Sequence, residues 1–99
     1  MKIVEIQNSP KKDKRYRVVL DDGKFYDFGL LNGSTYIDHN DDKKRMAYIA
    51  RHFANRLEKN LIENLIPSPA LFSIFLLWGK YKTLEENIHF LNSLFRKMA

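Results

Sequence analysis

The sequence predicts an α+β fold in which a small three-stranded antiparallel meander is followed by three helices, in the order βββααα. Three observations support it. The first 28 residues carry short runs rich in β-branched and aromatic residues around an Asp-Gly turn, later residues repeat apolar side chains at helical spacing, and proline and glycine separate the helical segments. Ninety-nine residues are enough for one core, so a single domain over residues 1–99 is expected.

The three strands are expected at residues 2–7, 15–20 and 25–28. In the second strand Tyr16, Val18 and Leu20 alternate onto one face, while Arg17 and Val19 point to the other. The sequence Asp-Asp-Gly-Lys at residues 21–24 predicts the hairpin turn between the last two strands, because Asp and Gly tolerate positive φ.

A first helix is expected to begin near residue 41 and to end at about Glu58, after a short extended piece at residues 35–37. Asp38 and Asn40 are both competent N-caps. Apolar residues recur at intervals of three, four and four on one face: Met46, Ile49, Phe53 and Leu57. Residues 61–66 are ambiguous, because they are consistent with a longer helix or with a buried turn.

A second helix is expected at residues 69–78, with Ser68 as its N-cap, Pro69 at its first position and Gly79 as its stop. Thr83 and Glu86 form the capping-box pattern of a third helix.

The second helix is apolar on nearly every side, so it is buried in the core or shared with a partner. If it is shared, it provides a self-association surface and the chain forms a homodimer. The residues of that surface would be Phe72, Phe75, Leu76 and Trp78.

The net charge of +5 and the pI of about 9.5 favour polyanionic partners. Cationic side chains gather in the loop before the second strand and on the first helix, so we expect salt-dependent, sequence-independent contact with nucleic acid, DNA rather than RNA. The alternative is a solvated helix face with ion pairs such as Asp41–Arg45. The expected nucleic-acid-binding residues are Lys12, Lys14, Arg15, Arg17, Lys43, Lys44, Arg45 and Arg51.

No catalytic constellation is present in the sequence. There is no cysteine, no His-x-x-x-His pair and no phosphate-binding glycine loop, so we expect no enzyme, metal, cofactor or small-molecule substrate. We interpret His39 as a residue that bonds the backbone near the helix start and His52 as a half-buried polar tip. A pocket joining both histidines to an aspartate would favour an enzyme instead.

The N-terminal residues lack the apolar stretch of a signal peptide, and the longest apolar run, Ala70 to Trp78, has nine residues. A membrane span needs roughly 20. We therefore expect a protein that is neither secreted nor embedded in a membrane.

Several short motifs resemble those of short basic proteins of uncharacterised function from large eukaryotic DNA viruses and virophages. They are Asp-Phe-Gly at 27–29, Tyr-Ile-Asp-His at 36–39, Asp-Lys-Lys-Arg at 42–45, Tyr-Ile-Ala-Arg-His at 48–52 and Leu-Leu-Trp-Gly-Lys at 76–80. The chain departs from the pattern at residues 71–75, where these proteins carry Gly-Phe-Trp. The resemblance implies a viral protein located in the virion, the host cytoplasm or the virus factory.

With the charge pattern, the resemblance leads to a non-enzymatic, genome-associated protein as the first hypothesis. The alternative is a virion structural or adaptor protein that acts through protein–protein contact and self-association.

Overall fold

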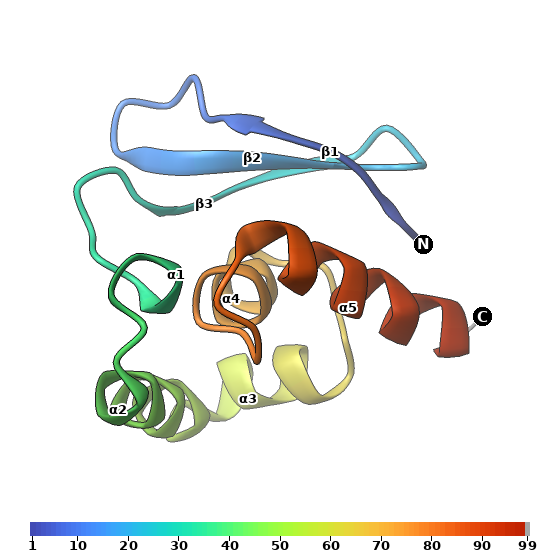
Figure 1. The fold of residues 1–99 in the computed structure, drawn as a ribbon. Helices are drawn as coiled ribbons and strands as arrows, with labels where there is room; N and C mark the ends of the chain where they lie inside the picture. The colour runs from blue at the N-terminus through green and yellow to red at the C-terminus, as the bar shows by residue number, and fades with distance from the viewer. Residues whose placement is uncertain (99) are drawn as a thin grey trace.

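The computed structural model describes residues 1–98 and confirms the α+β fold, with three antiparallel strands followed by helices. The strands pair in the order β1-β2-β3, and the helices all lie on one side of the sheet (Figure 1). Their bounds are β1 Ile3–Asn8, β2 Lys14–Leu20 and β3 Phe25–Leu30. The expected meander is therefore correct, and the third strand continues two residues beyond its predicted end.

The two faces of the sheet have different environments, as the alternation in β2 predicts. Val18, Leu20 and Phe28 face the helices and are fully or almost fully buried. On the outer face, Arg17 pairs with Asp27 of β3, its direct partner in the register. The turn between β2 and β3 is closed by a hydrogen bond from the Leu20 N–H to the Lys24 carbonyl.

The helical part has two layers beneath the sheet (Figure 1). Next to the sheet lie α4, the π-helix η1 and α5, and farther away lie α2 and α3, with the single turn α1 beside the open end of β3. The bounds are α1 Tyr36–His39, α2 Asp42–Phe53, α3 Arg56–Glu63, α4 Pro69–Phe72, η1 Ser73–Leu77 and α5 Leu84–Met98.

The segment predicted as the second helix is the centre of the core. Ser68 caps it and Pro69 begins it, as expected, but after one α-turn it widens into η1. Phe72 and Leu76 are completely buried, Trp78 is almost so and Phe75 is half-buried. These four side chains pack inside the molecule, between the sheet and the other helices, and do not form the exposed surface that the self-association hypothesis needs.

The segment predicted as one helix to Glu58 is divided between α2 and the first turn of α3. Residues 36–39 form α1 instead of an extended piece, and Asp41, rather than Asp38 or Asn40, caps α2 by accepting hydrogen bonds from two backbone N–H groups. Asn55 then accepts from the Glu58 N–H and starts α3. The helix break thus falls at Asn55, a capping residue that lies between Phe53 and Leu57 in the chain.

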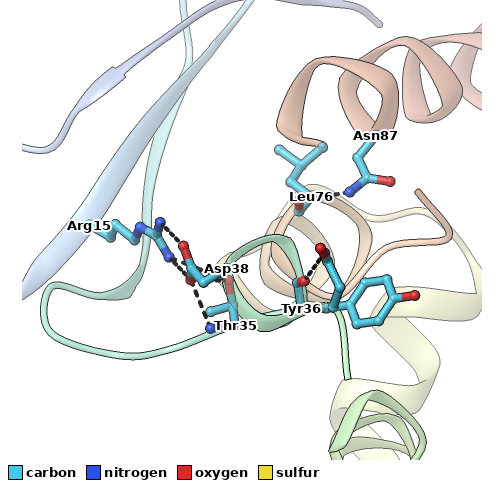
Figure 2. Close-up of polar contacts among 7 residues, drawn as sticks. Arg15, Thr35, Tyr36, Asp38, Leu76 and Asn87 are labelled. Atoms are coloured by element: carbon cyan, nitrogen blue, oxygen red, sulfur yellow. Dashed lines mark hydrogen bonds and ion pairs between the residues drawn. The ribbon is translucent and has the colours of Figure 1, made fainter. Parts of the chain in front are cut away.

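Two asparagines of α5 tie distant segments to it. The amide of Asn87 donates to the Leu76 carbonyl (Figure 2). It also donates to the Tyr81 carbonyl, and its oxygen accepts from the Tyr81 N–H, so this buried side chain fixes the loop after η1. Asn92 holds the first strand, since it accepts from the Ile3 N–H at 2.7 Å and donates to the Ile3 carbonyl at 3.1 Å. Thr83 accepts from the Glu86 N–H, which confirms the predicted cap of α5.

Candidate functional site

A cleft of about 520 Å³ lies where the open end of the β2–β3 hairpin, away from the turn at residues 21–24, faces α2 and α4. Its walls come from three separate parts of the chain: the sheet with the following loop, helices α2 and α3, and the α4–η1 segment. We call it the basic cleft, and the residues that define it are Lys14, Leu30, Ser34, Arg51, Glu58 and Ala70.

A second hollow of about 260 Å³ adjoins the basic cleft. We call it the recess. It shares Ser34, Tyr48, Arg51 and Trp78 with the cleft and adds Lys44. The two basic groups predicted from the sequence each contribute to these two hollows. Lys14 comes from β2, and Lys44 and Arg51 come from α2.

The three cations of the cleft and recess have no acidic partner. Within residues 1–98, no carboxylate oxygen lies within 4.0 Å of the charged nitrogens of Lys14, Lys44 or Arg51. Lys12 and Lys43 are also exposed and form no ion pair within this range, but they do not line either hollow. Five of the eight predicted contact residues are therefore available to a polyanion, and three of them lie together.

Arg15 is occupied within the protein. Its guanidinium donates to both carboxylate oxygens of Asp38, at 2.7 and 2.8 Å, and also to the Thr35 hydroxyl (Figure 2). The hydrogen bonds from Arg15 hold the pKa of Asp38 well below its ordinary value, and the same contacts raise the pKa of Arg15. Arg15 therefore joins β2 to α1 and fixes the loop that forms one wall of the cleft.

Arg17 and Arg45 also form hydrogen bonds within the protein, Arg17 with a carboxylate and Arg45 with backbone carbonyls. Arg17 donates to both oxygens of Asp27, whose side chain is only 3% exposed, and these bonds lower the pKa of Asp27. The Nε of Arg45 donates to the carbonyls of Trp78 and Gly79, both at 3.0 Å. The prediction that these two arginines contact phosphate is therefore replaced by a role in holding the fold, because their partners lie in other elements and are not visible in the sequence.

An aromatic column forms the wall between the cleft and the recess. The Tyr48 ring stacks on Trp78 at 4.1 Å with an interplanar angle of 8°, and its other side faces His52 at 4.2 Å. The guanidinium carbon of Arg51 lies 5.6 Å from the centre of the Tyr48 ring, within cation–π range. Burial raises the pKa of Tyr48. Trp78 and His52 thus fix the Tyr48 ring, and Arg51 lies beside it.

The two histidines lie near the ends of this column. His39 accepts a hydrogen bond at Nδ1 from the Asp41 N–H, which confirms its predicted role, while its Nε2 is enclosed and has no hydrogen-bond partner within residues 1–98. His52 is half-buried, as predicted, and its Nδ1 lies 2.5 Å from Oε2 of Glu58. The contact between His52 and Glu58 was not predicted, because a spacing of six residues across a helix break gives no signal in the sequence.

The described residues show neither of the two features that would point to a metal site or a membrane span. Within residues 1–98, no three His, Cys, Asp or Glu side chains are grouped so that they could hold a metal ion. Among these residues there is also no helix with the length and apolar character needed to cross a bilayer.

Comparison with known proteins gives one similarity. Residues 4–52, just under half of the chain, match the model of a family of unknown function (DUF5754). The matched span contains β2, β3, α1 and nearly all of β1 and α2, and so includes Lys14, Lys44 and Arg51. No curated protein and no solved structure matches the chain.

Proposed function

We propose that this protein binds nucleic acid without sequence preference, through phosphate contacts in the basic cleft and the recess. One observation carries the proposal: Lys14, Lys44 and Arg51, from segments some distance apart in the chain, line two adjoining hollows and have no carboxylate partner within residues 1–98. Contacts to phosphate position a nucleic acid without reading its bases, so this arrangement favours binding that does not depend on sequence.

The number of cations sets the expected salt dependence. Neutralising three phosphates gives a slope of log K against log salt of about −2.7 for duplex DNA and about −2 for a single strand. The remaining charges, Lys12 and Lys43 among them, lie on the exposed surface and add steering at low ionic strength.

The test is fluorescence anisotropy of a labelled oligonucleotide, titrated between about 50 and about 200 mM salt. We expect the double variant Lys14→Ala/Arg51→Ala to weaken binding at least tenfold and to make the slope shallower by about two units. The matched control is Lys24→Ala/Lys82→Ala, which removes the same charge. Lys24 lies in the turn at the opposite end of the sheet, and neither lysine lines the cleft or the recess.

Equal weakening by both double variants would mean that only net charge matters, and the proposal for this site would be wrong. Binding that does not change with salt, or no binding near physiological ionic strength, would contradict the function itself.

A genome-associated place in the virion or virus factory is part of the same proposal and rests on the resemblance to short viral proteins. The alternative is an adaptor that acts through Phe72, Phe75, Leu76 and Trp78. The structure does not support it, since these residues pack in or against the core and are not exposed to a partner. Dimer formation through other residues stays a prediction, which light scattering would check.

A further inference from the structure

The basic cleft is larger and more apolar than phosphate contact alone requires. Its volume of about 520 Å³ falls within the range of roughly 300–1,000 Å³ typical of small-molecule sites. The wall contributed by α4 is apolar, with the exposed Pro69 and the half-buried Ala70, and Leu30 at the edge is 68% exposed. A surface that only neutralises charge needs cations, not an apolar hollow behind them.

The cations and the apolar wall are arranged for a ligand that has both characters. Lys14 and Arg51 enter the cleft from different elements, β2 and α2, and Ser34 adds a hydroxyl group. A nucleotide has a charged phosphate, a polar sugar and a flat, weakly polar base. Each of these parts finds a matching part of the wall.

We infer that the basic cleft receives one nucleotide unit of a single strand, with its phosphate at Lys14 and Arg51 and its base against Pro69 and Ala70. This inference rests on the proposed function and adds the class of nucleic acid. In a duplex every base is paired and stacked, and turning one out costs a few kcal/mol. The cleft therefore selects single strands, whose bases are free to enter.

The aromatic column offers no free ring face on which the base could stack. Proteins that bind single strands commonly stack bases on aromatic rings. Here both sides of Tyr48 are already covered, by Trp78 at 4.1 Å and by His52 at 4.2 Å. The base must then rest on aliphatic groups, which contact its face without distinguishing the atoms on its edge.

The chain contains an internal reporter for this test. Trp78 is the only tryptophan, and it lines both the cleft and the recess. Its fluorescence should therefore change when the cleft fills, whereas an oligonucleotide held elsewhere on the surface should leave it unchanged.

The experiment compares oligo(dT) with a DNA hairpin of equal phosphate number, using anisotropy for affinity and Trp78 fluorescence for location. We expect oligo(dT) to bind at least tenfold more tightly than the hairpin and to quench Trp78, with thymidine monophosphate quenching it at higher concentration. Ser34→Phe, which fills the cleft, should remove this preference, and Asn32→Phe in the same loop should not, because Asn32 is exposed and does not line the cleft.

The outcomes separate the two proposals. If the hairpin binds as tightly as oligo(dT), if Trp78 fluorescence does not respond, or if Ser34→Phe has no effect while Lys14→Ala/Arg51→Ala still weakens binding, the inference is overturned and the proposed function stands. If neither polymer binds, both are overturned.

Discussion

Helices α2 and α5 look alike in the sequence, since each carries a clear apolar stripe, yet they are buried to very different extents. α5 buries Asn87, Leu91 and Phe95, whereas no residue of α2 is buried. Met46, on the apolar stripe of α2, is 68% exposed. An apolar stripe in the sequence therefore does not by itself determine how deeply its residues are buried, which depends on the layer in which the helix lies.

The position of each helix explains the difference. α5 packs beside η1 in the layer next to the sheet, while α2 belongs to the outer layer (Figure 1). α2 is attached mainly by polar and aromatic contacts, namely the Arg45 bonds to carbonyls and the stack of Tyr48 on Trp78. Such an attachment leaves Lys44 and Arg51 exposed, which suits a helix that presents charge rather than filling a core.

The strongest test of this comparison is the same truncation in each helix. Phe95→Ala should cost about 4 kcal/mol of unfolding free energy, since the side chain is 3% exposed, and Phe53→Ala on α2 should cost about half of that. Urea unfolding measures both. Should Phe95→Ala not fold, Phe95→Leu would serve in its place. Equal losses would show that α2 is as deeply packed as α5.

A smaller effect is expected at the junction between η1 and α5. A Cβ at Gly79 would lie 2.1 Å from the Phe75 carbonyl oxygen and 2.6 Å from Oδ1 of Asn87, so Gly79→Ala should cost about 3 kcal/mol. The control is Gly23→Ala, where φ is +86° but no atom is near, and a loss of about 1 kcal/mol is expected from backbone strain alone. Comparable losses in thermal and urea unfolding would mean that the junction can relax.

The next prediction concerns the loss of folding stability at acidic pH. The pKa values of Asp27 and Asp38 are lowered in the folded protein, by Arg17 and Arg15 respectively. Their stabilising contribution is therefore complete above the unfolded carboxyl pKa of about 3.9 and is lost as the pH falls from there through the folded values.

Unfolding in urea from neutral pH down to strongly acidic pH checks this dependence. Asp38→Asn should make the loss of stability below about pH 4 less steep. Lys44→Gln on α2, which removes a cation without a carboxylate partner in residues 1–98, should leave the profile unchanged. If the unfolding free energy of Asp38→Asn falls with pH as steeply as that of the unchanged protein, the stabilising role assigned to the Asp38 carboxylate is wrong.

The smallest effect is expected on the outer face of α2. Met46→Gln should change the unfolding free energy by less than about 0.5 kcal/mol, because the side chain is mostly in water. A loss above about 1 kcal/mol in urea unfolding would indicate that Met46 is covered in solution, for example in a dimer.

The meander was predictable because its signals are local. Alternation in β2 and the Asp-Gly turn depend on residues that are neighbours in the chain, as do the caps at Ser68 and Thr83. The split of the first predicted helix was less accessible, since Asn55 acts as a cap only because the chain bends there.

The candidate site was predictable only as two groups of charges. Which cations are free depends on partners far away in the chain, such as Asp38 for Arg15 and the Trp78 carbonyl for Arg45. The apolar wall of the cleft likewise comes from residues that looked like ordinary core.

The two hydrogen bonds between Asn92 and Ile3 link residues that are 89 positions apart. During synthesis, the first strand therefore leaves the ribosome long before its clamp exists. The free edge of β1 stays available to other chains until α5 has emerged, and a long pause before α5 is synthesised would lengthen that period. Asn92→Ala would leave this edge uncovered in the finished protein, with β1 held by its pairing with β2 and by the burial of Ile3.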